Sequence, residues 1–303
     1  MGKYVLFAIV TLAFLFALAC QPSARPPDGK KSIVVTYSIL GSVVKELVGD
    51  QANVTISVPN GLDPHEWEPS AKDIEAINKA DLVIQNGLGL EGGMEKTLET
   101  AARSGVRFFT ASDHITVRHV GTGEGIPSGD PDQVVGAPDP HLWTDPIAMK
   151  GVASALAPVL KDLGLDVTSQ ALNLESRLDN LDREVADTVA AIPQEERKLV
   201  TGHESMGYFA QRYGFKLIGV IIPSLSSQAG VSAADLAALK QVIQDNRVKA
   251  IFTELGTSPA VARAIANETG VSVVELATHT LSGDGSYFTF MRNLATVITN
   301  TLK

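Results

Sequence analysis

Short apolar runs alternate with amphipathic segments along the chain from Ser32 onward. The apolar runs have the length of buried strands, and the amphipathic segments have the period of helices, which together indicate an α/β fold. We expect strands over 33–37, 53–58, 81–85, 106–111, 198–201, 217–222, 250–253 and 271–276. We expect helices over 40–49, 71–79, 93–104, 147–163, 169–191, 206–213, 232–244 and 260–269.

The order of these elements in the first half of the chain recurs in the second half. We therefore predict two similar lobes, each a parallel sheet flanked by helices, over 32–168 and 193–303. One long α-helix, placed at 169–192, links them and favours limited lobe closure. Its expected apolar stripe is Leu172, Leu174, Leu178, Leu181, Val185 and Val189. Ligands of such folds bind beyond the carboxyl ends of the strands, so we expect a site between the lobes.

Residues 1–20 have the pattern of a lipoprotein signal peptide. Lys3 precedes an apolar run that ends at Cys20, the chain's single cysteine, although Ala17 stands where such signals usually carry leucine. The polar, proline-rich segment 21–31 is typical of a flexible tether. We predict lipidation at Cys20 and an extracytoplasmic, membrane-anchored or periplasmic protein. With Cys20 acylated, a metal site would have to use nitrogen and oxygen ligands.

The charge balance narrows the partners. The chain carries 34 acidic and 25 basic residues, for a net charge of −9. No basic cluster is present that could neutralise a row of phosphates, so we expect no nucleic-acid binding.

Histidines are the strongest chemical signal in the sequence. Of six histidines, His65, His141, His203 and His279 each follow a predicted strand, two in each lobe. His65 and His141 both lie in an Asp-Pro-His-x-Trp motif. Proline fixes the backbone before the ring, which lowers the entropy lost on orienting a ligand. Because imidazole nitrogen suits zinc and four ligands complete a tetrahedron, the pattern predicts a metal site.

Several motifs together resemble the metal-binding lipoproteins of zinc and manganese ABC transporters, the cluster A-I solute-binding proteins. They are VPNGLDPHEWEP (58–69), NGLGLE (86–91), DPHLWTDP (139–146), TGHESMGYFAQRYG (201–214) and IFTEL (251–255). The resemblance covers essentially the whole mature chain. It implies a non-enzymatic, monomeric receptor with metal held between two lobes and delivered to an ABC permease and its ATPase. It places the first three ligands at His65, His141 and His203, and histidine at the third place favours Zn²⁺ over Mn²⁺.

The fourth ligand departs from the family pattern, which usually has an aspartate there. Counting forward from 268–270 places His279 at that position, whereas counting back from 285–287 places Glu275 near it. We favour His279 because a loop residue reaches the cleft more easily than a strand residue. Zinc members often also carry a histidine-rich loop before the second ligand. Segment 121–137 has no histidine and is interpreted as a solvated loop, with His119 alone at its edge.

Two motifs suggest other activities. The GLGLEG run (87–92), with Asp113 further on, fits a dinucleotide fingerprint, but the unit is not the first of its sheet and an exported protein lacks a supply of NAD. The HESMG run (203–207) is one residue short of a nucleophile elbow, for which Glu254 and His279 would complete a hydrolase triad. We consider both interpretations weak.

A zinc-dependent hydrolase is the stronger enzymatic alternative. Three histidines and a base such as Glu204 could activate water, but a four-histidine shell leaves no position for it. A manganese receptor of the same family is the alternative among binding proteins. The sequence also leaves open whether four loop carboxylates support the imidazoles or are merely polar: Asp63, Glu66, Glu68 and Asp139.

Overall fold

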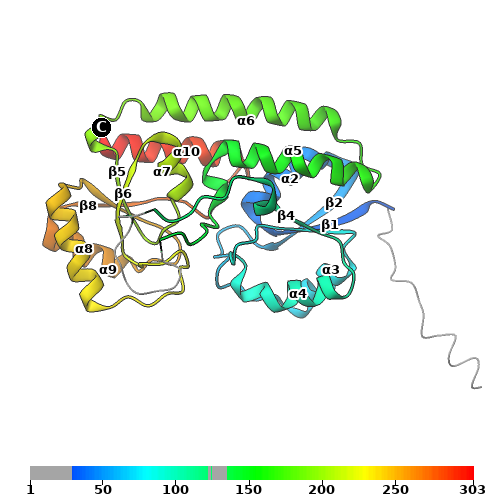
Figure 1. Cartoon of the computed structure of the whole chain (residues 1–303), viewed down its shortest axis with the longest axis horizontal. Helices are drawn as coiled ribbons and strands as arrows, with labels where there is room; N and C mark the ends of the chain where they lie inside the picture. The colour runs from blue at the N-terminus through cyan, green and yellow to red at the C-terminus, as the bar shows by residue number, and fades with distance from the viewer. Residues whose placement is uncertain (1–28, 122–123, 125–134) are drawn as a thin grey trace, which may run out of the picture.

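The computed structural model describes residues 29–121, 124 and 135–303. The predicted signal peptide with Cys20, and all but the last residues of the predicted tether, lie outside the described residues. Two lobes sit side by side beneath a layer of long helices (Figure 1). Within the described residues, no helix is both long and apolar enough to cross a membrane.

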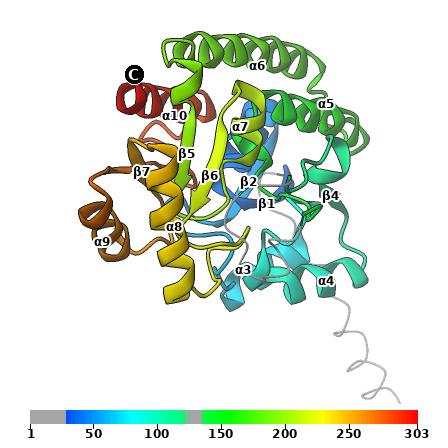
Figure 2. The ribbon, with the colours of Figure 1, turned by 60° about the vertical axis from the view of Figure 1, so that its left-hand side comes forward.

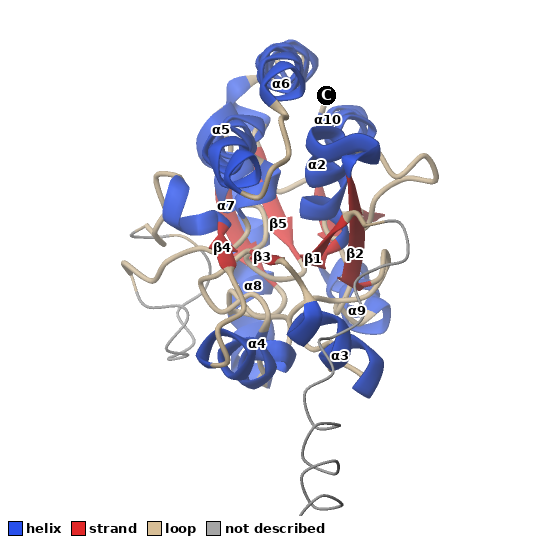
Figure 3. Ribbon diagram, turned by 90° about the vertical axis from the view of Figure 1, so that its right-hand side faces the viewer, coloured by secondary structure: helices blue, strands red, loops and turns tan. Residues whose placement is uncertain are grey.

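The first lobe contains a four-stranded parallel sheet in the order β2-β1-β3-β4. In β1 (Lys31–Tyr37) the last five residues are all buried, as expected for a central strand with both faces covered. Helices α2 and α5 cover one face of the sheet, and α3 and α4 cover the other (Figure 3). The remaining elements are α2 (Ser38–Val48), β2 (Ala52–Val58), α3 (Ala71–Lys79), β3 (Leu82–Gln85), α4 (Glu95–Arg103), β4 (Phe108–Thr110) and α5 (Pro146–Asp162).

The second lobe contains two parallel strand pairs, β5–β6 and β7–β8. Strands β5 and β7 lie next to each other, so the spatial order β6-β5-β7-β8 repeats the order of the first lobe. Helices α8 and α9 lie on one side of these strands, and α7 and α10 lie on the other (Figure 2). The elements are β5 (Lys198–Thr201), α7 (Gly207–Tyr213), β6 (Lys216–Val220), α8 (Ala233–Asn246), β7 (Ala250–Thr253), α9 (Pro259–Thr269), β8 (Ser272–Glu275) and α10 (Tyr287–Leu302). The predicted fold class is confirmed.

Helix α6 (Thr168–Val189) spans 22 residues, about 33 Å at 1.5 Å per residue, and runs above both lobes (Figure 1). The predicted stripe is wrong at one position. Leu172 is 65% exposed, and Ala171 is the buried residue of that turn. Leu172 is two residues from Leu174, so it points to nearly the opposite side of the helix. Ala171 is three residues from Leu174 and lies on the buried side.

Helix α10 (Tyr287–Leu302) has no counterpart among the helices predicted from the sequence. This helix runs beside α6 (Figure 1) and buries nine of its residues, including Phe290, Met291 and Leu294. It also contacts α2 of the first lobe, so the end of the chain ties the lobes together.

The segment before α10 is hydrogen-bonded to the first lobe. The Asn60 side chain accepts from the Leu281 amide at 2.7 Å and donates to the Leu281 carbonyl at 2.9 Å. The Ser42 hydroxyl accepts from the Tyr287 amide at 3.0 Å and donates to the Gly285 carbonyl at 2.8 Å. These contacts fix the chain on both sides of residues 281–287, close after His279.

Candidate metal centre

Four histidines meet at the facing carboxyl ends of the two sets of strands. His65 follows β2, His141 follows β4, His203 follows β5 and His279 follows β8. All four are buried, with at most 3% of any residue exposed. Two lobes therefore contribute two rings each, as the sequence predicted for this side of the fold.

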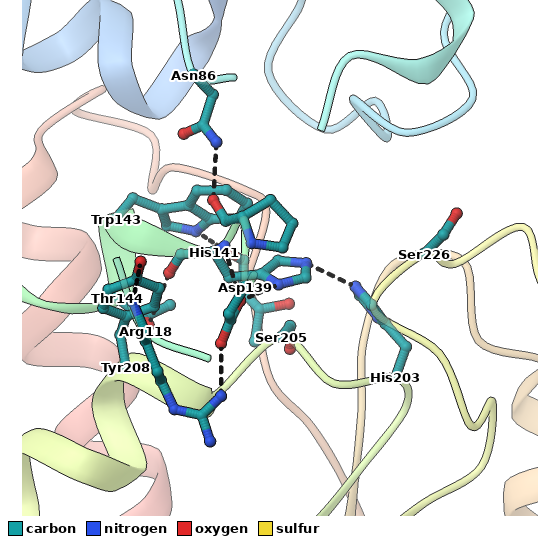
Figure 4. Close-up of polar contacts among 12 residues, drawn as sticks. Asn86, Arg118, Asp139, His141, Trp143, Thr144, His203, Ser205, Tyr208 and Ser226 are labelled. Carbon is teal, nitrogen blue, oxygen red and sulfur yellow. Dashed lines mark hydrogen bonds and ion pairs between the residues drawn. The ribbon is translucent and has the colours of Figure 1, made fainter. Parts of the chain in front are cut away.

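The ring nitrogens of the four histidines lie close enough together to share one metal ion. The Nε2 atom of His141 lies 3.2 Å from Nε2 of His65. It also lies 3.2 Å from Nε2 of His203, a contact drawn in Figure 4. One nitrogen from each of the four rings can be chosen so that all lie within 4.8 Å of one another. A tetrahedral site with zinc–nitrogen bonds of about 2.0–2.1 Å has nitrogens about 3.3–3.4 Å apart. The two separations of 3.2 Å from His141 are close to that value.

The fourth ring, that of His279, has one nitrogen free for such a role. Its Nδ1 atom pairs with the Thr278 hydroxyl at 2.8 Å. Its Nε2 atom is buried and has no hydrogen-bond partner within the described part of the chain. The rival residue, Glu275, lies at the end of β8 with its side chain exposed and is outside the cluster.

Both Asp-Pro-His motifs fold into the same local turn. The aspartate side chain accepts the backbone N–H of the histidine two residues later, at 3.0 Å for Asp63 and His65 and at 2.9 Å for Asp139 and His141. Such turns are the usual local hydrogen bonds of aspartate. Trp143 packs against the rings of His141 and His279, each with centroids 5.2 Å away.

The two aspartates then differ. Asp139 also accepts from Nδ1 of His141 at 2.9 Å and from Arg118 at 3.0 Å, so it directs Nε2 of His141 toward the other rings (Figure 4). Asp63 instead accepts from Ser227 of the second lobe at 2.6 Å. Glu66 and Glu68 are exposed. Of the four carboxylates left open by the sequence, Asp139 is the one found on an imidazole.

Glu254 is a buried carboxylate that the sequence suggested only as a possible triad acid, and not as a partner of the metal centre. It follows β7 and lies behind the second lobe's two histidines. Its Oε1 atom accepts the His203 amide at 2.9 Å and lies 3.2 Å from His203 Nδ1. Its Oε2 atom accepts from the hydroxyls of Ser205 and Thr278. The signal was available, because an acid directly after a predicted strand falls on the same edge as the histidines.

With this geometry in place, comparison with known proteins decides the family. The sequence profile of ZnuA, described as the periplasmic component A of a zinc-uptake complex, matches residues 33–301. The chain belongs to the ZnuA family. The resemblance inferred from the motifs is thereby confirmed.

Individual relatives of this ZnuA-family chain carry names for two metals. The zinc-binding lipoprotein AdcA of Streptococcus pneumoniae is 29% identical over 89% of this chain, but the chain spans only about half of that relative, 54%. The manganese-binding lipoprotein MntA of Halalkalibacterium halodurans is 28% identical over 94% of this chain and 92% of its own. The solved periplasmic zinc-binding protein TroA from Treponema pallidum superposes with a TM-score of 0.76 at 25% identity, covering 90% and 99% of the two chains.

Burial sets the protonation of the cluster in this ZnuA-family member. Burial, reinforced by the neighbouring rings, holds the pKa of His65 and of His279 well below the ordinary value. Burial also lowers the pKa of His141, although Asp139 opposes the shift. For His203 burial acts in the same direction, but the attraction of Glu254 outweighs it and raises the pKa. At neutral pH the rings of His65, His141 and His279 are therefore largely uncharged, as metal ligation requires.

The polar groups of the GLGLEG and HESMG runs form hydrogen bonds within the protein, which argues against nucleotide binding and serine hydrolysis. At the GLGLEG run, the amides of Gly87 and of the preceding residue, Asn86, donate to the carboxylate of Glu91 at 3.3 and 2.6 Å, so they already have a partner within the chain. The Ser205 hydroxyl of the HESMG run donates to Glu254 at 2.5 Å. A serine nucleophile would need that proton directed at a histidine. His119 is exposed and lies outside the cluster, and most of segment 121–137 lies outside the described residues.

Proposed function

We propose that this ZnuA-family chain captures zinc outside the cytoplasmic membrane and delivers it to an ABC permease and its ATPase. The observation that carries the proposal is the convergence of four buried imidazoles, whose nitrogens lie within 4.8 Å of one another and include two separations of 3.2 Å, close to those of a tetrahedral zinc site. In this proposal the ligands are His65, His141, His203 and His279, each binding through Nε2. The metal is cargo, which the chain binds and releases unchanged.

Manganese capture is the alternative, because several relatives are named for that metal. Mn²⁺ prefers carboxylate, carbonyl and water oxygens, whereas imidazole suits zinc. In the described structure the chemistry facing the centre of the cluster is nitrogen, and Asp139 and Glu254 lie behind the rings. The donor set therefore favours zinc.

We further propose that the chain acts as a monomeric receptor and not as an enzyme. Hydrolysis by zinc needs an open coordination position for water, and four histidines would fill the tetrahedron. The predicted lipid anchor at Cys20 would keep the receptor at the membrane surface, near its permease. The family description as a periplasmic uptake component supports an extracytoplasmic location.

Titration calorimetry of the mature chain with zinc and with manganese tests this function. We expect one zinc ion per chain, bound more tightly than manganese. Four ligands that share about 10–16 kcal/mol contribute roughly 3 kcal/mol each, so His279→Ala should weaken zinc binding by about 100-fold or more. Glu275→Ala is the matched control and should bind zinc like the wild type, because its exposed side chain lies outside the cluster. Unchanged affinity in His279→Ala would refute the four-histidine assignment.

A further inference from the structure

Glu254 is a buried carboxylate that lies beside both histidines of the second lobe. It is 6% exposed, at the carboxyl end of β7, and within the described residues its contacts are a backbone amide, two hydroxyls and two imidazoles. A buried carboxylate is costly unless its partners make its ionised form favourable. The hydrogen bonds that its two oxygens accept offset this cost.

One oxygen of this carboxylate serves His203. The Oε1 atom binds the His203 backbone amide at 2.9 Å and lies 3.2 Å from Nδ1 of the same residue. The backbone contact is a hydrogen bond that positions the main chain of His203. The ring contact is an electrostatic approach without hydrogen-bond geometry, and it leaves Glu254 as the nearest acceptor for a proton on Nδ1. An ionised carboxylate only accepts hydrogen bonds, so it favours the tautomer with the proton on Nδ1 and the lone pair on Nε2.

The other oxygen serves His279 through Thr278. Nδ1 of His279 is 2.8 Å from the Thr278 hydroxyl, and that hydroxyl donates to Oε2 of Glu254. Because the hydroxyl's proton is directed at the carboxylate, its lone pair accepts from Nδ1. The direct separation of Nδ1 from Oε2 is 3.9 Å, so the hydroxyl acts as a bridge. His279 is thereby held in the same tautomer as His203, with its unpartnered Nε2 available for metal.

Glu254 also brings negative charge close to the four histidines. Four neutral imidazoles bring no negative charge to a divalent cation, so the balance must come from carboxylates behind them. Asp139 shares its charge with Arg118 at 3.0 Å. No lysine or arginine of the described chain forms an ion pair with Glu254, so its charge is directed at the two imidazoles.

We propose that Glu254 is the positioning residue for both metal-binding histidines of the second lobe, a single carboxylate that orients two rings and supplies negative charge to the site. It does not touch the metal itself. The inference rests on the proposed function, because it assumes that His203 and His279 are ligands. It goes further by making zinc affinity depend on a residue outside the ligand set.

The test compares Glu254→Gln with Glu91→Gln in the mature chain. Glutamine keeps the size of glutamate, but its amide can donate to Nδ1 of His203 and favour the wrong tautomer. We expect zinc affinity to fall about 10- to 100-fold, the usual effect of removing such a partner. Glu91 is the matched control, since it is also buried and bound by amides of Asn86 and Gly87 and by the Thr36 hydroxyl. Its substitution should leave zinc affinity unchanged.

A second measurement separates positioning from general damage. Nitrogen-15 NMR of the metal-free protein at alkaline pH, where the rings are neutral, reports which ring nitrogen carries the proton. We expect a changed tautomer at His203 in Glu254→Gln and none in Glu91→Gln. Wild-type affinity with unchanged tautomers in Glu254→Gln would overturn the proposal, as would an equal loss in Glu91→Gln.

If Glu254→Gln does not fold, as judged by circular dichroism, Thr278→Val decides the matter. Valine keeps the shape of threonine but breaks the bridge from His279 to Glu254. A smaller loss of zinc affinity with an altered His279 tautomer supports the proposal, and no change in either overturns it. Failure of the wild-type chain to bind zinc would instead contradict the proposed function, so the two failures are distinguishable.

Discussion

Zinc binding should respond to acid far less steeply than a site of four ordinary histidines would. Each imidazole must be unprotonated at the nitrogen that binds metal, so protons compete with zinc and affinity falls as pH falls. The number of protons displaced sets the slope. In this cluster burial keeps the pKa of His65, His141 and His279 below the ordinary value, while Glu254 raises that of His203.

The magnitude follows from counting these protons between pH 6.5 and pH 5.5. For one ring with a pKa of 6.5, competition increases about 5.5-fold over this interval, and four such rings together give about 900-fold. Here the pKa of His65 and of His279 lies well below 6.5 and that of His141 lies below it, so these rings compete less than ordinary ones, and His203 carries the main competing proton. The expected loss of zinc affinity is therefore about 5- to 10-fold, or roughly 1–1.4 kcal/mol.

The assay is competition for zinc against a chelator of known pH dependence, at pH 7.5, 6.5 and 5.5. His119→Ala serves as the control, since this exposed histidine lies outside the cluster and its removal should not alter the profile. A loss above about 100-fold between pH 6.5 and 5.5 would mean that several rings titrate together. The inferred burial effects on the histidines would then be refuted.

Three further predictions concern the scaffold. Small-angle scattering should show a radius of gyration near 19 Å that does not change measurably with zinc, because the contacts before α10 tie the lobes together; a clear compaction would contradict this. Leu174→Ala should cost about 2–5 kcal/mol in chemical denaturation, whereas Leu172→Ala, at an exposed position, should change stability by less than about 0.5 kcal/mol. Gly207→Ala should cost about 1–3 kcal/mol and weaken zinc binding, because the added methyl would overlap Asp139 and Arg118, while Gly283→Ala has free space and should show neither effect in a thermal melt.

The strands and helices were predicted well from the sequence where the apolar pattern agreed with the turn and capping residues at the ends of the element. Strands 198–201 and 250–253 have the observed bounds, and the Ser70–Asp73 capping box marks the start of α3. Strand β4 is shorter than expected, since only Phe108–Thr110 pairs with β3. The missing α10 has a different cause. Its nine buried residues lie on one side of the axis, and Arg292, Asn293, Thr296 and Asn300 are exposed on the other. The helical period was therefore present in the sequence, but no helix was assigned to it.

The histidines could be found because their position follows from topology. Parallel strands bring their carboxyl ends to one edge, so residues just after β2, β4, β5 and β8 meet without any knowledge of distances. The same reasoning applies to Glu254 after β7. A single carboxylate at the end of a strand is commonly a solvated or locally hydrogen-bonded group, however, whereas four histidines at one edge indicate a metal site. What the sequence could not supply was orientation. Whether Asp63 or Asp139 reaches a ring depends on Ser227 and Arg118, which lie far away in the chain.

The division of labour between the two lobes follows from that orientation. His141 and His279 follow β4 and β8, the corresponding edge strands of the two lobes, yet they are held differently. His141 is bound directly by Asp139 from its own turn, while His279 depends on Glu254 from another strand, through a threonine. A ligand held within its own turn can keep its orientation when the lobes shift slightly. One held across strands keeps its orientation only while β7 and β8 stay in register, so disturbance of the second lobe should loosen His203 and His279 together.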